Sequence, residues 1–330
     1  MPLHPHLPNL EEKALQEGSA LLALEFLKKE LMNDPRVGAR KLLSKYQKKV
    51  LTEETEILRL DRLWAHEKEL TAKGYVLIAG VDEAGRGPLA GPVVAGAVVL
   101  YPGTVLKGVD DSKKLTPEKR DALFEVIRQK AESVGLGEAS AAEIDELNIF
   151  QAARLAMDRA IRNLPKPPYF LLTDAMKLPS FPHIPQRPLI HGDALSASIA
   201  AASIMAKVTR DRMMEELDRK YPGYGFLSHK GYGTAEHLQA IQEKGLCPEH
   251  RMTFGPVAEA LAREASGGPL GYWTGKLEAA KNGADLKKIG LLIKRVASEN
   301  MAAKDLEKLR EIYAGKADRF KGDGFPGGKA

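Results

Sequence analysis

The chain has 330 residues, of which 44% are hydrophobic, and its formal net charge is +5 at pH 7. This length allows one large domain with extensions or two domains, and the positive charge fits a polyanionic partner without requiring one. The single cysteine, Cys247, excludes an intramolecular disulfide and is typical of a reducing cytoplasm. Because the chain shows neither a signal-peptide pattern nor a run of about 18 apolar residues, we expect no membrane association.

Residues 1–74 are predicted to form an all-helical N-terminal extension. Apolar residues recur at helical spacing over 21–31, and Asp34 followed by Pro35 supplies an N-cap and a first-turn residue for a second helix. A third helix is expected to begin near Thr52. The second helix is basic, so it either contacts phosphate groups or belongs to a helical clamp that only stabilises the core. Its cations are Arg36, Arg40, Lys41, Lys45, Lys48 and Lys49.

Residues 75–264 mix strands with helices. One helix is expected to begin at Pro117, because Thr116 is a good N-cap and Glu118 a favourable first-turn acid. Strands follow one another early and then alternate with helices, which predicts an α/β fold with a mixed sheet flanked by helices. The predicted strands cover 75–81, 93–100, 134–139, 169–173 and 188–191, and two further helices cover 144–164 and 196–221.

Residues 265–330 are predicted to be a helical, basic C-terminal extension. The sequence Ser266-Gly267-Gly268-Pro269 is a plausible linker, and apolar residues at helical spacing predict helices around 286–296 and 306–312. The end of the chain, from Phe320, is rich in glycine and lysine and is expected to be disordered. The extension is either a nucleic-acid tether or a partner-binding helix pair, and the sequence does not decide between them.

Four carboxylates follow the ends of three predicted strands. Asp82 and Glu83 come directly after an apolar stretch, where a charge is costly unless it is paired or metal-bound. Asp174 ends a second apolar stretch, and Asp193 lies between the last strand and an alanine-rich helix. Acids at three strand ends can converge on one sheet edge and supply the hard oxygen ligands that two Mg²⁺ or Mn²⁺ ions need. The alternative is that each acid is an N-cap or a turn residue.

Two glycine-rich segments are candidates for nucleic-acid contact. Gly85-Arg86-Gly87 follows the first two acids, and glycines let a ligand approach the backbone while an arginine can bind a phosphate. The segment 221–234 is aromatic, glycine-rich and basic, which suits stacking on a sugar or base, although it could equally pack on its own domain. Other cations near the acids could follow a nucleic-acid backbone, although each alone is typical of a solvated face: Lys113, Lys114, Lys207, Arg210 and Arg212.

Together these residues resemble ribonuclease HII, the type 2 bacterial ribonuclease H family. The matching blocks occur in the family's order over about 75–260, and the first of them, Gly80 to Val94, is highly specific. The N-terminal helices resemble an extension carried by one branch of the family, whereas nothing after Ser266 resembles it. The other matching blocks are 111–115, Asp174, 192–194, 198–204, 206–211, 230–234 and His250-Arg251.

The resemblance implies a ribonuclease H-like fold: a five-stranded mixed sheet with helices on both sides and a small helical substrate-binding subdomain at about 210–264. It implies an endonuclease that requires Mg²⁺ or Mn²⁺ and cleaves the RNA strand of RNA–DNA hybrids. It also implies nicking on the 5′ side of a single ribonucleotide in duplex DNA, leaving 3′-hydroxyl and 5′-phosphate ends. By position it assigns metal binding to Asp82, Glu83, Asp174 and Asp193, ribonucleotide contact to Gly85, Arg86 and Gly87, and stacking on the following deoxyribose to Tyr232.

We therefore expect a monomeric, cytoplasmic enzyme that removes ribonucleotides from DNA and degrades hybrids. Two alternatives stay open. One is another metal-dependent nuclease of the same fold that acts on DNA, which a substrate with one embedded ribonucleotide would distinguish. The other is a nucleic-acid-binding module with structural acids, which would show unchanged stability and no metal response after Asp82→Asn or Asp174→Asn.

Overall fold

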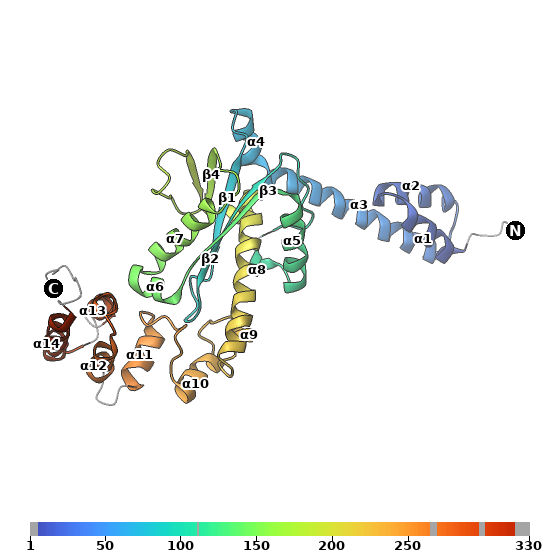
Figure 1. Ribbon diagram of the computed structural model, residues 1–330. Helices are drawn as coiled ribbons and strands as arrows, with labels where there is room; N and C mark the ends of the chain where they lie inside the picture. Colours follow the sequence, from blue (N-terminus) through green and yellow to red (C-terminus); the bar gives the residue numbers. More distant parts are fainter. Residues whose placement is uncertain (1–5, 111, 265–268, 297–300, 321–330) are drawn as a thin grey trace.

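The structure is a computed structural model that describes residues 6–110, 112–264, 269–296 and 301–320 (Figure 1). Its strands are β1 (Ile78–Ala84), β2 (Val93–Leu100), β3 (Ala131–Ala139), β4 (Phe170–Asp174) and β5 (Gln186–Leu189). They form one mixed sheet in the order β3-β2-β1-β4-β5. β2 pairs antiparallel with β1 and β3, whereas β4 lies parallel to β1 and β5. The predicted α/β fold with a five-stranded mixed sheet is confirmed.

Helices cover both faces of this sheet (Figure 1). α7 (Ile149–Arg162) packs on one face, while α8 (Ala197–Lys220) and α5 (Pro117–Lys130) pack on the other. The alanine-rich first half of α8 has a steric reason. A Cβ on Gly96 of β2 would lie 2.5 Å from the carbonyl oxygen of Ala202, so the backbone of α8 rests directly on the sheet.

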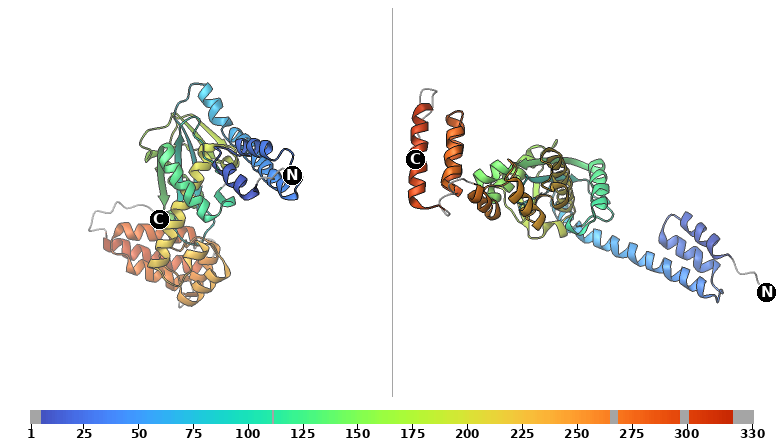
Figure 2. Two further views of the ribbon diagram at one scale, coloured as in Figure 1. Left: turned by 90° about the vertical axis from the view of Figure 1, so that its right-hand side faces the viewer. Right: turned by 90° about the horizontal axis from the view of Figure 1, so that it is seen from below.

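Four helices precede the sheet: α1 (Leu7–Gln16), α2 (Ala20–Glu30), α3 (Val37–Leu63) and α4 (Ala65–Ala72). α1 and α2 pack against the first half of α3 around a hydrophobic cluster of their own, which includes Leu27 and Tyr46. α3 then extends as a long rod to the sheet, so this cluster stands apart from it (Figure 2). α4 instead belongs to the core, because Leu70 packs with Ile78 and Phe170.

Two helix boundaries in this extension differ from the prediction. No break occurs near Thr52, because the hydroxyl groups of Thr52 and Thr55 donate to the carbonyl oxygens of Lys48 and Leu51 at 2.8 and 2.7 Å within a continuous α3. Asp34 is not the N-cap of α3. Its carboxylate instead accepts the backbone N–H and the guanidinium of Arg36, which occupies the cap position.

The helix predicted over 144–164 is two helices, α6 (Ala141–Leu147) and α7. Asn148 separates them with a φ of 80°, and its side chain caps α7 by accepting the N–H of Gln151. The other two predicted helices are confirmed: Thr116 caps α5 as expected, and α8 closely matches the helix predicted over 196–221.

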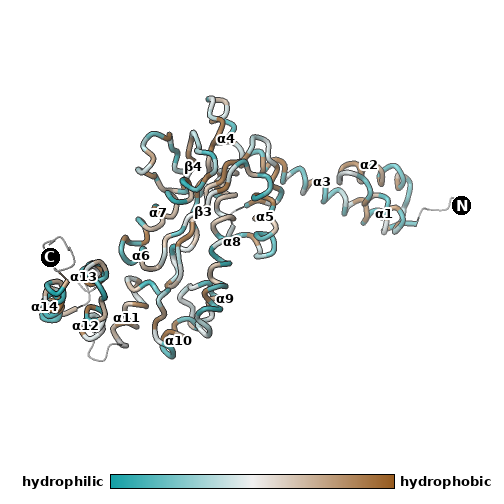
Figure 3. Tube along the Cα trace, viewed as in Figure 1, coloured by the Kyte–Doolittle hydropathy of each residue, from teal (hydrophilic) through white to brown (hydrophobic). Residues whose placement is uncertain are grey.

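Shorter helices complete the chain. Figure 3 shows hydrophobic residues in both extensions as well as in the sheet. Each extension has a hydrophobic cluster of its own, and the cluster of the C-terminal helices includes Trp273, Leu277 and Leu286. The helices predicted around 286–296 and 306–312 are present, whereas α12 was not predicted. The remaining elements are the 3₁₀ turns η1 (Ser112–Lys114) and η2 (Gly192–Ala194), and the helices α9 (Phe226–His229), α10 (Ala235–Lys244), α11 (Gly255–Glu264), α12 (Pro269–Ala279), α13 (Gly283–Val296) and α14 (Ala303–Phe320).

Three predicted features lie wholly or mostly outside the described residues: Asp111, the linker at 266–269 and the tail from Phe320. Within the described part of the chain, every helix is too short or too polar to traverse a lipid bilayer.

Candidate active site

Asp82 and Glu83 lie in the second half of β1, because this strand continues to Ala84 in pairing with β2 and does not end at residue 81 as predicted. Asp174 is the last residue of β4, and Asp193 lies on η2. Because β1 and β4 pair in parallel with Val81 opposite Thr173, the next residues, Asp82 and Asp174, are neighbours. The Oδ1 atom of Asp174 accepts the backbone N–H of Gly192 at 2.8 Å, and this bond holds the η2 turn that carries Asp193. The structure thus brings together residues from three places in the sequence.

Burial and mutual repulsion make this edge of the sheet unfavourable for negative charge. Asp82 is buried, and burial, Glu83 and Asp174 together raise its pKa well above the ordinary value, against hydrogen bonds that include one from Ser203. Burial also raises the pKa of Glu83, although the Arg86 guanidinium, 3.1 Å from Oε1, opposes the change. The other oxygen of Glu83, Oε2, is buried without a hydrogen-bond partner. A cation bound at this edge would offset both the burial of the carboxylates and their mutual repulsion.

The side chains do not form a closed metal site in the conformation seen. Among the described residues, no three acidic, histidine or cysteine side chains are arranged to hold a metal ion. The donor set nevertheless fits Mg²⁺ or Mn²⁺ by chemistry, because it consists of carboxylate oxygens and includes the unpartnered Oε2 of Glu83.

Two buried arginines shape the glycine-rich turn next to these acids. Arg251 donates to the carbonyl oxygens of Gly85, Arg86 and Gly91 at 2.6, 2.9 and 3.0 Å. Arg210 donates to the carbonyl oxygens of Ala90, Pro92 and Lys230 at 3.2, 2.9 and 3.1 Å. Burial lowers the pKa of both, to about 9 for Arg251 with Arg210 as the second cause.

These contacts change the interpretation of Arg210. It was predicted to contact substrate, but its side chain is only 1% exposed and its donors are directed to backbone carbonyls. The geometry therefore favours a role in holding the turn. Arg251, which is fully buried, had been matched to the family without a role. Nothing in its local sequence signals these contacts, because the carbonyls lie about 160 residues earlier.

Tyr232 lies against the glycine-rich turn. A Cβ on Gly87 would be 3.5 Å from Cε1 of the Tyr232 ring, so the two predicted substrate contacts are neighbours. The Tyr232 side chain is half exposed, whereas Tyr224 is buried and donates its hydroxyl to the carbonyl of Gly245 at 2.9 Å. The exposure of Tyr232 is consistent with its predicted stacking role, which the buried Tyr224 could not take.

The remaining predicted cations vary in exposure. Lys113 and Lys114 are exposed on η1, and Lys114 lies 3.3 Å from Asp110. Lys207 is half-buried and pairs with Asp211 at 2.6 Å, and burial lowers its pKa. A substrate role for these lysines stays a prediction.

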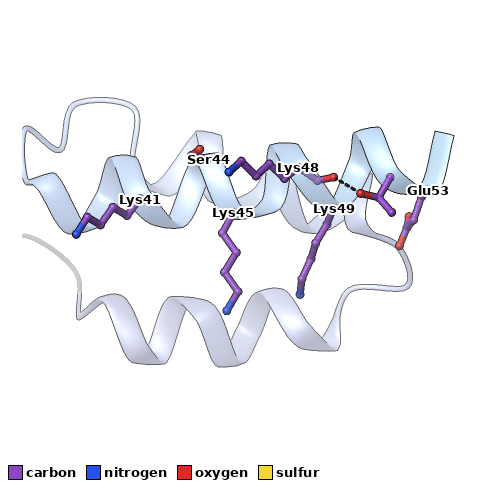
Figure 4. A pocket seen from close by; sticks show the side chains of 7 residues that line it. Lys41, Ser44, Lys45, Lys48, Lys49 and Glu53 are labelled. Carbon is purple, nitrogen blue, oxygen red and sulfur yellow. Dashed lines mark hydrogen bonds between the residues drawn. The ribbon is translucent and has the colours of Figure 1, made fainter. Parts of the chain in front are cut away.

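A second concentration of positive charge lies on α3 (Figure 4). Lys45 and Lys49 extend toward the neighbouring helix, where Lys45 pairs with Glu11. Among the described residues, no ion pair involves Lys41 or Lys48. These lysines surround a surface hollow with a volume of about 840 Å³. The residues that line it are Lys41, Ser44, Lys45, Lys48, Lys49, Thr52 and Glu53.

Comparison with known proteins decides the family. The model of the ribonuclease HII family matches residues 79–257, and a model of the ribonuclease HII N-terminal domain matches residues 12–71. The ribonuclease HII of Geobacillus kaustophilus is 54% identical over 231 residues, covering 70% of this chain and 88% of that protein. This chain belongs to the ribonuclease HII family. The resemblance found in the sequence is confirmed, and with it the prediction of a hydrolytic endoribonuclease with ribonuclease H activity on RNA–DNA hybrids.

Other members and solved structures are similar over comparable regions. The ribonuclease HII of Bacillus cereus strain Q1 is 46% identical over 260 residues, covering 77% of this chain and all of that protein. The crystal structure of ribonuclease H2 from Pyrococcus horikoshii is 29% identical, with a TM-score of 0.49, and covers 57% of this chain and 98% of that one.

A buried histidine pair supports Tyr232 in this ribonuclease HII family member. Nδ1 of His250 accepts the N–H of Cys247 at 2.9 Å, so its Nε2–H is free to donate to Nε2 of His237 at 3.1 Å. The Nδ1–H of His237 then donates to the carbonyl oxygen of Tyr232 at 2.9 Å. One proton on each ring satisfies this chain, so both histidines are neutral in the fold.

We expect acid to destabilise the protein through these histidines. Burial and the neighbouring His237 lower the pKa of His250 to about 4, and burial also lowers that of His237. In the unfolded chain these histidines bind a proton near pH 6.5, whereas in the fold they bind it only at lower pH. The free energy of unfolding therefore keeps its full value above about pH 6.5 and decreases as the pH falls toward 4. The His250 contribution is about 3 kcal/mol.

Urea unfolding between pH 7.5 and 4 would measure this loss. His250→Gln is the control, because it cannot gain the proton and should show a flatter profile while the carboxylates titrate as before. Parallel profiles for the two proteins would contradict the assignment.

Proposed function

We propose that this chain, besides cleaving RNA strands of hybrids, nicks duplex DNA on the 5′ side of a single embedded ribonucleotide, leaving 3′-hydroxyl and 5′-phosphate ends. The observation that carries the proposal is the proximity of Gly87 to the exposed Tyr232 ring, on a turn that directly follows Asp82 and Glu83. A recognition element this close to the acids would test one sugar while the neighbouring phosphodiester is cut.

We infer that Asp82, Glu83, Asp174 and Asp193 hold two Mg²⁺ or Mn²⁺ ions when substrate is bound. The support is the unpartnered Oε2 of Glu83 and the repulsion that raises the pKa of Asp82. Two such ions supply an activated water and stabilise the charge that develops on the phosphate and the leaving oxygen. The scissile phosphate would provide some of the oxygen ligands, so a substrate without the 2′-hydroxyl could be misplaced at the acids.

The buried Arg251 orients the turn for substrate. It binds the carbonyl oxygens of Gly85 and Arg86. In a trans peptide the N–H points away from the carbonyl, so the N–H groups of Arg86 and Gly87 point away from Arg251. Such donors suit the 2′-hydroxyl and its adjacent phosphate, because the 2′-hydroxyl both donates and accepts hydrogen bonds. The half-exposed Arg86 side chain could add a contact to the phosphate.

We expect Tyr232→Ala to weaken the discrimination between a DNA duplex with one ribonucleotide and a long RNA–DNA hybrid. Loss of stacking on the following sugar should lower kcat/KM for the single ribonucleotide by roughly 10- to 100-fold, in line with about 1–3 kcal/mol for an aromatic stack. Tyr232→Phe keeps the ring and serves as the control. Steady-state cleavage of both substrates by the three proteins is the measurement, and an unchanged ratio in Tyr232→Ala would refute stacking.

We expect the exposed lysines of α3 to add phosphate contacts. Replacing Lys41 and Lys48 by Gln should weaken hybrid binding and reduce the slope of log K against log[salt] by about 0.9 per lost contact. Lys68→Gln, on α4 and paired with Asp61, is the control. Fluorescence anisotropy at several salt concentrations would measure the slope. An unchanged slope would favour the alternative of a helical clamp that only stabilises the core.

The decisive experiment uses three labelled duplexes: DNA with one ribonucleotide, all-DNA of the same sequence, and an RNA–DNA hybrid. Each is incubated with the full chain in Mg²⁺, in Mn²⁺ and in chelator. A metal-dependent nick 5′ to the ribonucleotide, with all-DNA intact, is the expected result. Cleavage of the hybrid alone would remove the proposed junction recognition, and cleavage of all-DNA would favour a DNA nuclease. The monomeric state, the cytoplasmic location and the role in DNA repair stay predictions.

A further inference from the structure

A buried carboxyl group from the N-terminal extension binds the start of α8. Glu67, on α4, is only 4% exposed. Its Oε1 atom accepts three hydrogen bonds: from the hydroxyl groups of Ser196 and Ser198, both at 2.6 Å, and from the backbone N–H of Ser198 at 3.0 Å. A carboxylate also suits this place electrostatically, because the first turn of a helix carries partial positive charge.

The start of α8 is continuous with the turn that carries Asp193. The backbone N–H groups of Leu195 and Ser196 donate to the carbonyl oxygen of Gly192 at 3.0 and 2.9 Å, and Gly192 in turn donates to Asp174 at 2.8 Å. Few torsion angles therefore separate the serines bound by Glu67 from Asp193, and one hydrogen bond links this turn to Asp174. Any change in the direction of the first turn of α8 would move Asp193.

α4 holds the chain on both sides of this turn. On the other side, Arg187 of β5 binds the carboxylate of Glu69 at 2.8 and 3.0 Å and contacts His66 at 3.1 Å. Leu70 of α4 is buried in the cluster that contains Ile199 of α8. The helix thus contacts β5 before Asp193 and α8 after it.

Packing alone does not explain a glutamate at position 67. The second oxygen of Glu67, Oε2, is buried without a hydrogen-bond partner, which is costly compared with an apolar side chain of similar size. We propose that Glu67 is a positioning residue, which fixes Asp193 relative to Asp174 so that the N-terminal extension completes the metal-binding edge of the catalytic domain. The inference rests on the proposed function, because it assigns metal binding to Asp193.

Four variants of the full chain test this role. Glu67→Ala removes all three hydrogen bonds, Glu67→Gln keeps an acceptor oxygen, and Ser198→Ala removes one hydroxyl donor. Leu27→Ala loosens the separate hydrophobic cluster of α1, α2 and the first half of α3, away from α4 and the serines. The readouts are the backbone amide exchange of residues 192–200 without metal, Mn²⁺ binding by calorimetry, and the Mn²⁺ concentration for half-maximal hybrid cleavage.

In Glu67→Ala we expect faster exchange at 192–200, and weaker Mn²⁺ binding with a half-maximal concentration about 10-fold higher, as for other residues that orient metal ligands. Cleavage at saturating Mn²⁺ should recover to within about 3-fold, because the acids themselves are intact. Glu67→Gln should stay near wild type, Ser198→Ala should shift in the same direction by less, and Leu27→Ala should destabilise the N-terminal helices without changing the Mn²⁺ dependence.

Unchanged Mn²⁺ binding and half-maximal concentration in Glu67→Ala and Ser198→Ala would overturn the inference, as would an equal shift in Leu27→Ala. If Glu67→Ala does not fold, Ser198→Ala decides the question by the same criteria, and Glu67→Gln is still expected to stay near wild type. Failure of the proposed function looks different, because wild type itself would then show no response to Mn²⁺.

Discussion

Replacing Asp82 by Asn is expected to reduce cleavage by on the order of 10³-fold or more, as for groups that act as a unit at a reacting centre. Asn is nearly isosteric and leaves one oxygen, but it lacks the charge that would bind a divalent cation. The same change should stabilise the metal-free protein at pH 7. Burial and the neighbouring Glu83 and Asp174 raise the pKa of Asp82, so its ionised form destabilises the fold above the ordinary pKa.

The measurement combines the nicking assay with thermal unfolding in chelator and in Mn²⁺. Each kcal/mol gained without metal should raise Tm by about 2–4 °C for a domain of this size, and Mn²⁺ should stabilise wild type more than the variant. Asp121→Asn is the matched control, because that carboxylate is exposed and pairs with Arg212. Retained cleavage together with an unchanged Tm would mean that Asp82 is not part of the metal site.

Gly85→Ala is expected to be strongly disruptive to both stability and cleavage. Gly85 has a φ of 95°, which a residue with a Cβ rarely adopts, and the added Cβ would overlap the Nε and Cδ atoms of Arg210. Because Arg210 is buried and bonded to three carbonyl oxygens, it cannot move without breaking them. We expect a loss of more than about 3 kcal/mol in unfolding free energy, and junction nicking reduced more than hybrid cleavage.

Gly103→Ala separates the two causes of this loss. Gly103 has a φ of 83°, but a Cβ there would meet nothing within 4 Å. It should therefore cost only about 1–2 kcal/mol and leave cleavage unchanged. Urea unfolding and cleavage of both substrates by the two variants are the measurements. Equal losses of stability would show that the contact with Arg210 is unimportant.

The sequence predicted the features that depend on local pattern. An apolar stretch that ends in acids at Asp82 and again at Asp174 indicates strand ends whatever the rest of the chain does, and the parallel pairing of β1 and β4 then makes the two acids neighbours. A side chain that caps a helix a few residues away is local in the same sense, and so the start of α5 after Thr116 was predicted correctly.

Contacts between distant segments were beyond the sequence. Arg210 lies on a helix face that the pattern treats as solvated, yet it is buried against carbonyl oxygens about 120 residues earlier. Two local boundaries were also predicted wrongly: the Thr52 hydroxyl bonds within the continuous α3 and does not begin a helix, and Asn148 separates two helices where the pattern predicted one. In each case the local sequence is compatible with both outcomes.

The sequence by itself identified the family through its matching motif blocks, and it predicted the mixed sheet and the acids near its strand ends, because apolar periodicity and charges that follow it are properties of consecutive residues. Only the tertiary structure decided that Arg251 orients the glycine-rich turn and that Glu67 binds the start of the helix after Asp193. The physical reason is that a buried charge must find its hydrogen-bond partners wherever the fold places them, and those partners lie more than 100 residues away along the chain.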